Sequence, residues 1–225
     1  MEVFPYHRAG FVESPADKPS DNGKDDLAKS RCIIRIVTAI PEDLFPISKT
    51  WPDKTCIRLN KSRDDSSPII PTPFYNATLR VESSVGAYHK LFYQASTLCE
   101  SFNDVCLLGR VWLRQRGLGK SIARGGFGPF EWAAICAGLL QGGGAHGKPV
   151  LAPGYSSYQL FKATLQFLAA RDMATIPFLT HSDDLKLQKS DVPVFFDGLR
   201  GTNILYKMTP WSYSIVSLRG TQCCA

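Results

Sequence analysis

The spacing of apolar residues along the chain changes once, near residue 83. Before that point, apolar and polar residues alternate in three short runs, at 31–37, 55–60 and 76–82. This alternation predicts three half-buried strands. Each run also has one arginine on the face we expect to point outward: Arg35, Arg58 and Arg80. The pattern therefore predicts a small sheet that is covered on one side.

Beyond residue 83 the apolar spacing becomes that of amphipathic helices. The first predicted helix starts after Ser83 and Ser84, which are plausible N-caps. Its expected apolar stripe is Tyr88, Leu91, Phe92, Ala95, Leu98, Cys99 and Phe102. In the second, about 103–116, the apolar side is Val105, Leu108, Val111 and Trp112. Arg110 and Arg114 share its opposite side, because residues four apart are neighbours on a helix.

Helix boundary signals mark where these segments end and two more begin. Gly117 and Gly119 are expected to end the second helix. A third begins at Pro129 and ends before the three glycines at 142–144, the usual placement of proline and glycine at helix ends. A fourth follows Ser156, and its expected apolar face is Leu160, Phe161, Thr164, Leu165 and Leu168. Gln159, three residues after Ser156, completes a capping box.

These elements predict an α+β fold, with a sheet region at 31–83 followed by a helical domain at 84–212. Residues 1–30 are polar and interrupted by prolines, which is typical of a flexible arm. Beyond Asp172 the helical pattern weakens, and the run at 194–196 is strand-like. Residues 213–225 are predicted to be a frayed tail.

Composition narrows the class of protein. The chain has 225 residues, 44% of them hydrophobic, which is enough for a buried core. Its seven cysteines lie mostly in apolar runs, so a reducing compartment is expected, and none forms a Cys-x-x-Cys zinc motif. There is no apolar signal core and no apolar stretch long enough for a membrane helix, so we expect a soluble, intracellular protein. The ending Cys223-Cys224-Ala225 lacks the cysteine four from the end that simple prenylation needs.

The net charge of +6 is concentrated between Asp104 and Glu131, where no acidic residue occurs. Five cations lie there: Arg110, Arg114, Arg116, Lys120 and Arg124. Two interpretations stay open for them. Arginines at helix ends also complement the helix dipole, so the segment is compatible with a solvated connection between helices. The alternative is contact with RNA phosphates, and five cations without one acid favour it. Trp112 and Trp132 are expected to be core residues.

The candidate catalytic patterns do not meet their requirements. Residues 117–121, Gly-Leu-Gly-Lys-Ser, resemble the end of a phosphate-binding P-loop. The required earlier glycine is replaced by Arg114, and the segment follows a helix where a P-loop follows a strand. None of the four histidines lies in a nucleophile motif. The predicted strands carry outward arginines where nucleotidyl transfer needs metal-binding carboxylates. We therefore expect neither metal nor cofactor.

Five blocks in order carry a resemblance to a known family. They lie at 31–36, 71–76, 107–117, 125–132 and 157–163, and the longest reads Leu107-Leu-Gly-Arg-Val-Trp-Leu-Arg-Gln-Arg-Gly117. The ordered combination, across roughly residues 31 to 210, resembles the Nrap family of nucleolar RNA-associated proteins. The resemblance implies a partial nucleotidyltransferase-like antiparallel or mixed sheet, followed by a helical domain like that of poly(A) polymerases and oligoadenylate synthetases.

The same resemblance implies a function. Nrap proteins act in the nucleolus, in the small-subunit processome that processes pre-ribosomal RNA, chiefly as scaffolds. Their active relatives carry a Gly-Ser followed by paired aspartates, and this chain has neither Gly-Ser nor Asp-x-Asp. Relatives usually have lysine at the position of Arg110, which in active polymerases lies near the nucleotide phosphates. The five cations are therefore candidate contacts for RNA phosphate.

The expected function is a non-catalytic, RNA-associated scaffold in ribosome biogenesis, located in the nucleolus. Its expected partners are ribosomal RNA and other pre-ribosome assembly proteins, with no membrane and no small-molecule substrate. Two alternatives stay open: a metal-dependent nucleotidyltransferase acting on RNA ends, and a truncated remnant. The chain is far shorter than a typical member of the family, so a fragment of a longer protein is also expected.

Overall fold

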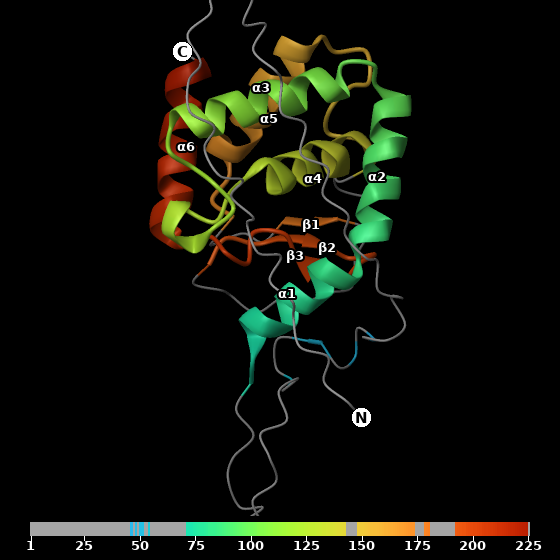
Figure 1. Ribbon diagram of the computed structural model, residues 1–225. Coiled ribbons are helices and arrows are strands. Elements are labelled where there is room, and N and C mark those ends of the chain that lie inside the picture. Colours follow the sequence, from blue (N-terminus) through green and yellow to red (C-terminus); the bar gives the residue numbers. More distant parts are fainter. Residues whose placement is uncertain are drawn as a thin grey trace, which may run out of the picture. The chain divides into compact units, whose positions relative to one another are not determined.

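The computed structural model describes residues 46, 48, 50, 51, 54, 71–142, 148–173, 178–180 and 192–224, all of which lie within one compact unit, Thr38–Ala225. Helices dominate this part of the chain (Figure 1). The α-helices are α1 (Pro73–Ser83), α2 (Val85–Leu98), α3 (Phe102–Gln115), α4 (Pro129–Leu140), α5 (Ser157–Ala170) and α6 (Pro210–Cys224). A 3₁₀ helix, η3 (Ile122–Arg124), lies between α3 and α4, and the strands are β1 (Phe178–Thr180), β2 (Phe195–Asp197) and β3 (Thr202–Asn203).

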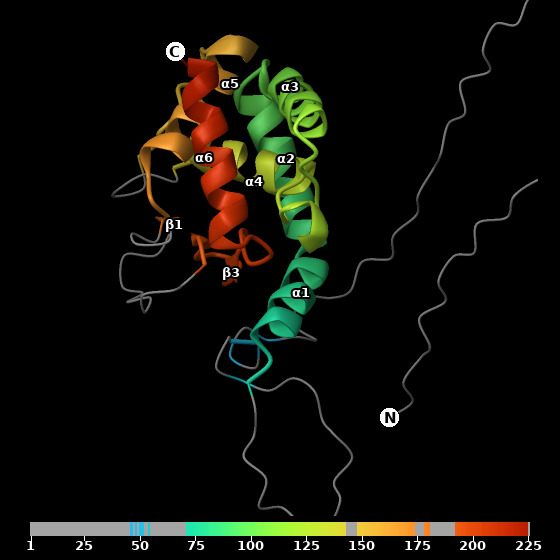
Figure 2. The same cartoon turned by 90° about the vertical axis from the view of Figure 1, so that its left-hand side faces the viewer.

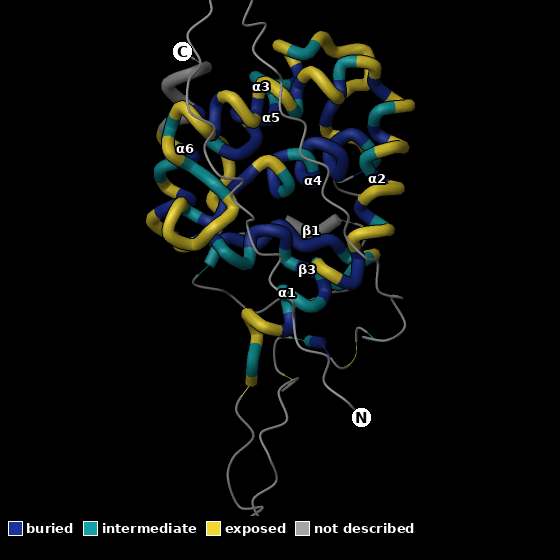
Figure 3. The backbone as a smooth tube through the Cα atoms, in the orientation of Figure 1, coloured by how far each residue is buried: buried dark blue, intermediate teal, exposed yellow. Residues whose placement is uncertain are grey.

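Helix α4 is the centre of the hydrophobic core. Nine of its 12 residues are buried, and α2 and α3 both pack against it. The tube in Figure 3 is dark blue along most of α4, whereas α2 and α3 alternate between buried and exposed turns. A helix that is apolar on nearly all sides has to be enclosed by other elements, and the amphipathic helices supply their apolar faces for that purpose.

The boundary signals predicted for the second, third and fourth helices are confirmed, whereas the first helix, α2, ends at Leu98, before Cys99 and Phe102 of its expected stripe. At the end of α3, the Gly117 N–H donates to the Arg114 carbonyl (3.1 Å) and the Leu118 N–H to the Leu113 carbonyl (3.0 Å), which is a Schellman motif. Gly117 has a φ of 71°, a conformation that glycine adopts without strain. Pro129 is the first residue of α4. The capping box of α5 is present, because the Ser156 N–H donates to Gln159 Oε1 (2.9 Å) and the Gln159 N–H to Ser156 Oγ (3.3 Å).

The predicted strand at 76–82 is wrong, because these residues belong to helix α1. Asn76 shows why the chain folds this way. Its buried side-chain amide donates to the carbonyls of Trp51 and Lys54, both at 2.8 Å. These two long-range hydrogen bonds hold Trp51 and Lys54 against α1. The other two predicted strands, 31–37 and 55–60, lie outside the described residues.

The apolar faces of α2 and α3 differ in part from the prediction. Leu98, Leu108 and Val111 were expected to be buried, but their side chains are exposed. Gly109 lies on the buried side of α3. It faces Trp132 so closely that an added Cβ would lie 2.2 Å from Trp132 Nε1. The absence of a side chain at Gly109 lets α3 approach Trp132 closely, and this rotates the buried face of α3 away from Leu108 and Val111.

The described strands form one sheet of order β1-β2-β3 near the C-terminal end of the chain. β1 pairs parallel with β2, with Phe178 opposite Phe195, and β2 pairs antiparallel with β3, with Asp197 opposite Thr202. The strand-like run at 194–196 thus overlaps β2 at Phe195 and Phe196. The described part of the chain is mostly helical and has a small sheet. Its fold class is therefore α+β, as predicted. Figure 2 shows the strands at the lower end of the helices, near α1.

The frayed tail predicted at 213–225 is wrong, because residues up to Cys224 form helix α6. α6 packs along α5. Its residues Tyr213 and Val216 are buried and belong to the hydrophobic core. The Tyr213 hydroxyl donates to the Leu168 carbonyl at 3.1 Å, across the end of α5. No helix in the described ranges is long and apolar enough to cross a membrane.

A polar cluster joins α1, α2 and the turn after β2. Asp197 Oδ2 accepts a 2.7 Å ion-pair hydrogen bond from Arg200 Nη1, and Arg200 Nη2 donates to the Ala87 carbonyl at 3.2 Å. Arg80 Nη2 in turn donates to the Arg200 carbonyl at 2.7 Å. Arg80 was expected to point outward, but it is buried. Its guanidinium is satisfied by a backbone oxygen, which allows the burial.

Candidate nucleic-acid interface

The candidate site consists of the outer face of α3 and the connection from α3 to α4. We call residues 116–128 of this connection the cationic turn. Arg110 and Arg114 lie four residues apart on the exposed side of α3. Lys120 and Arg124 lie on the cationic turn, before and within η3. The site is thus carried by one helix and by the turn that follows it.

The cationic turn is held in one conformation by its own backbone. The Gly119 N–H donates to the Arg124 carbonyl at 2.8 Å, and the Gly126 N–H donates to the Ser121 carbonyl at 2.9 Å. Gly126 has a φ of 66°, and a Cβ on it would lie 2.3 Å from the Lys207 carbonyl oxygen. Only glycine fits that contact. The turn therefore presents its cations from a fixed backbone.

These hydrogen bonds also explain why the apparent P-loop is not one. A P-loop holds phosphate with free backbone N–H groups at a helix N-terminus. Here the amides of Gly119, Gly125 and Gly126 are already bonded within the turn. At the start of α4, the buried Glu131 carboxylate accepts the Gly128 N–H at 3.0 Å and lies 3.6 Å from Lys207 Nζ. A carboxylate thus caps the N-terminus of α4, the end of a helix at which a phosphate would otherwise bind.

The five candidate cations do not share one environment. Arg110, Arg114, Lys120 and Arg124 are exposed, and none of them forms an ion pair with an acidic residue in the part of the chain that the structure describes. Arg116 is half-buried instead, with its guanidinium 4.4 Å from the centre of the Trp112 ring. Its Nη1 also donates to the Trp112 carbonyl at 3.4 Å. Four of the five cations are therefore accessible to a partner, and the fifth packs on the core.

The two tryptophans near the site belong to the core, as predicted. Trp132 is fully buried, and its Nε1 donates to the Val105 carbonyl at 3.1 Å. Trp112 is also buried, with its ring 6.4 Å from that of Trp132. An exposed tryptophan, Trp211 in the first turn of α6, was missed by the sequence reasoning. Its sequence signal is weak: it follows Pro210 in a stretch without acidic residues.

Two features of the described residues bear on catalysis. Within them, no group of three or more histidine, cysteine, aspartate or glutamate side chains could hold a metal ion. Burial raises the pKa of the Cys106 thiol to about 11 and that of Cys136 further still, so both stay protonated at neutral pH. A protonated thiol is a poor nucleophile.

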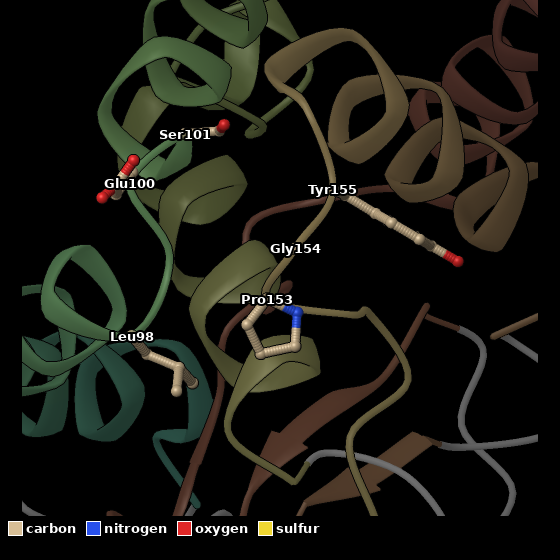
Figure 4. Close-up of a pocket in the computed structure, with 6 residues that line it drawn as sticks. All are labelled: Leu98, Glu100, Ser101, Pro153, Gly154 and Tyr155. Carbon is tan, nitrogen blue, oxygen red and sulfur yellow. The ribbon is translucent and has the colours of Figure 1, made fainter.

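A surface hollow of about 390 Å³ lies on a different part of the molecule. It is lined by Leu98, Glu100, Ser101, Pro153, Gly154 and Tyr155, from the α2–α3 connection and the segment before α5. In Figure 4 the Tyr155 side chain extends away from Leu98 and Glu100, and the hollow between them is open. Near the end of α2 the hollow carries the carboxylate of Glu100, which is negatively charged. The hollow therefore does not extend the cationic site.

Comparison with known proteins identifies the class of domain. Residues 101–225, more than half of the chain, match the family model described as the Nrap protein PAP/OAS-like domain. The domain that contains α3 to α6 and the cationic turn is therefore of this class. Residues 12–97 match the model described as Nrap protein domain 1. The chain thus belongs to the Nrap family, as the ordered sequence blocks predicted.

Curated relatives agree with this assignment. The chain is 35% identical over 217 residues to U3 small nucleolar RNA-associated protein 22 of Saccharomyces cerevisiae. This match covers 88% of this chain and 17% of the relative. It is 34% identical over 192 residues to the protein of the same name in Schizosaccharomyces pombe, covering 84% and 17%. Nucleolar protein 6 of Mus musculus is 30% identical over 189 residues, covering 80% and 16%. The chain therefore spans a small part of the length of these relatives.

Proposed function

We propose that this chain is a non-catalytic, RNA-associated scaffold segment that acts in ribosome biogenesis and pre-ribosomal RNA processing. Two relatives are named for association with U3 small nucleolar RNA and a third for the nucleolus, which supports a nucleolar location. The observation that carries the proposal is the surface of α3 and the cationic turn. It presents four exposed cations on a fixed backbone, without a paired acid among the described residues.

The proposed contact is between these side chains and RNA phosphates. Arginine and lysine bind phosphate oxygens without reading the base, and each contact releases counterions from the nucleic acid. Arg110 and Arg114 lie one helical turn apart, so both can reach one strand of phosphates along α3. The partners we propose are ribosomal RNA and other pre-ribosome assembly proteins, with no small-molecule substrate and no cofactor.

The division of the chain stays a prediction. We propose that residues 31–83 form the end of a nucleotidyltransferase-like sheet region, with the helical domain beginning at residue 84. The polar cluster at Arg80, Asp197 and Arg200 ties α1 to the turn after β2, and this supports a close relation between the two parts.

Nucleotidyl transfer is the alternative from another class. It needs clustered carboxylates that bind two metal ions beside the RNA end. The two buried acids closest to the candidate site and the sheet, Glu131 and Asp197, are already bonded to Lys207 and Arg200. The scaffold proposal is therefore the better supported one.

Charge reversal tests the RNA contact. In the triple variant Arg110→Glu, Arg114→Glu, Lys120→Glu, we expect the affinity for a structured ribosomal RNA fragment to fall at least tenfold. The slope of log Kd against log salt, measured between about 50 and 200 mM, should become shallower by about 0.7 to 0.9 for each phosphate that the variant no longer binds. Binding by filter retention or fluorescence anisotropy gives both values.

The matched control is the triple variant Lys54→Glu, Lys90→Glu, Lys148→Glu. It makes the same change in net charge at three exposed lysines outside the site. We expect its affinity and salt slope to stay close to those of the unmodified chain. Equal losses in both triple variants, or binding that does not weaken with salt, would contradict the proposed contact. Incorporation of labelled nucleotide into an RNA end would instead favour the enzyme.

A further inference from the structure

Trp211 is an exposed aromatic residue on a rigid support. Its side chain is 73% exposed, whereas the next two residues, Ser212 and Tyr213, are buried. The backbone around it is capped on both sides, because the Thr209 N–H donates to Ser212 Oγ (2.9 Å) and the Ser212 N–H donates to Thr209 Oγ1 (3.2 Å). Pro210 restricts the first helical residue of α6. The indole is thus displayed at a fixed place without being packed.

The start of α6 lies directly against the cationic turn. A Cβ built on Gly125 would lie 3.3 Å from Ser212 Cβ, the residue next to Trp211. Just before α6, the Lys207 carbonyl is in close contact with Gly126. The lower end of α6 and the loop between α3 and α4 are neighbours in Figure 1 as well. Trp211 therefore lies at the start of a helix that borders the cationic turn, the segment that carries Lys120 and Arg124, although about 90 residues separate them in sequence.

The positive charge of this part of the surface makes it suitable for a nucleic acid. The two segments that meet here, 105–130 and 198–225, contain eight lysines and arginines and no acidic residue. Two of the eight, Arg200 and Lys207, pair with acids outside these segments, at Asp197 and Glu131. Lys120 and Arg124 are exposed, and neither forms an ion pair with another described residue. An exposed indole beside such cations is the arrangement by which proteins hold single-stranded nucleic acid, with bases stacked on aromatic rings and phosphates bound by basic side chains.

We infer that Trp211 and the cationic turn together form a binding site for unpaired RNA. The indole stacks on the base of one nucleotide, and Lys120 and Arg124 bind the phosphates beside it. This inference rests on the proposed RNA association and deepens it, because it assigns single-stranded rather than duplex RNA to this end of the site. The ring has no charge, so its share of the binding free energy is independent of salt, unlike that of the cations.

The test uses the full chain with a short single-stranded RNA and a duplex of the same sequence. We expect Trp211→Ala to weaken single-strand binding roughly tenfold, because one base loses its stacking partner. Duplex binding should stay unchanged, and the salt slope should keep its value. Trp211→Phe keeps a stacking face and should retain most of the affinity. Tyr93→Ala is the control, since Tyr93 is a 69% exposed aromatic residue on α2.

The outcomes separate this inference from the proposed function. If single-strand binding depends on salt and Trp211→Ala behaves like Tyr93→Ala, the stacking site is refuted while the phosphate contacts stand. Equal losses for single strand and duplex would also refute stacking. Loss of binding to a protein partner, with RNA binding intact, would reassign Trp211 to a protein interface. A chain that binds neither RNA refutes both proposals.

Discussion

At the scale of single residues, a few close contacts decide how the core around the site is built. Gly109 is the clearest example, because its missing side chain makes room for the Trp132 indole. That indole donates to the Val105 carbonyl, which lies on the same helix as Gly109. Glu131 is another, since one buried carboxylate both caps α4 and pairs with Lys207. Each of these residues fixes the position of α3 or of the cationic turn.

A methyl group at Gly109 tests the first contact. In Gly109→Ala the new Cβ would lie 2.2 Å from Trp132 Nε1, so Trp132 or α3 has to move. We expect the free energy of unfolding to fall by about 1 to 3 kcal/mol, the usual cost of overpacking, despite the better helix propensity of alanine. Chemical denaturation monitored by circular dichroism measures it.

Gly86→Ala is the matched control. Gly86 is in α2, and a Cβ there would meet nothing within 4 Å. The helix propensity of alanine should then act alone and stabilise the protein by up to about 1 kcal/mol. If both variants changed stability in the same direction, the close packing of α3 on Trp132 would be refuted.

At the scale of elements, the arrangement depends on which helices enclose α4 and which bring distant segments to the site. α2 and α3 cover α4, and α6 packs along α5. The packing of α6 is also what places Trp211 beside the cationic turn. The proposed RNA site therefore needs an element at the far end of the described chain, although its four exposed cations lie between residues 110 and 124.

Two residues of α6 test its packing. Val216 is fully buried, whereas Leu218, two residues on, is 66% exposed. Val216→Asp would bury an unpaired charge, and we expect it to lower the free energy of unfolding by about 4 kcal/mol or more. Leu218→Asp introduces the same group at the surface and should change it by about 0.5 kcal/mol or less. Similar, small effects of both would mean that residues 213–224 do not pack on the core.

At the scale of the whole molecule, the groups that stabilise the fold differ from those that we propose to bind RNA. The core contains tyrosines that must stay neutral, whereas the surface at the site carries the positive charge. Burial raises the pKa of Tyr213 to about 12. Burial, with the nearby Asp197 carboxylate, raises that of Tyr88 even further. The folded state therefore retains these protons at pH values where the unfolded chain releases them.

The sign of the pH dependence follows from this difference. The stabilisation by Tyr213 is fully present below the unfolded pKa of 10.0 and is lost as pH rises toward about 12. We expect the free energy of unfolding to fall with pH over this interval, with a shallower slope in Tyr213→Phe. Denaturation at several alkaline pH values gives the slopes, and equal slopes in the two proteins would contradict the prediction.

Local sequence determined much of this protein. The Schellman glycine at 117, the proline at 129 and the capping box at Ser156 act within a few residues of each other, so the helix boundaries could be predicted. The ordered blocks identified the family, and the acid-free stretch located the candidate cations. These signals are contained in short stretches of sequence, and they do not depend on which helices or strands pack together in the folded protein.

Other features depended on contacts between distant residues. Alternation at 76–82 suggested a strand, yet the hydrogen bonds of Asn76 with Trp51 and Lys54, and of Arg80 with Arg200, stabilise a helix there. The buried face of α3 is set by Trp132 against Gly109, and apolar spacing alone does not encode that contact. The segment taken for a tail is a packed helix, and only its packing brings Trp211 to the cationic turn. Tertiary structure decided these points because burial and hydrogen bonding are shared between segments far apart in the chain, whereas helix caps and charge are properties of the segment itself.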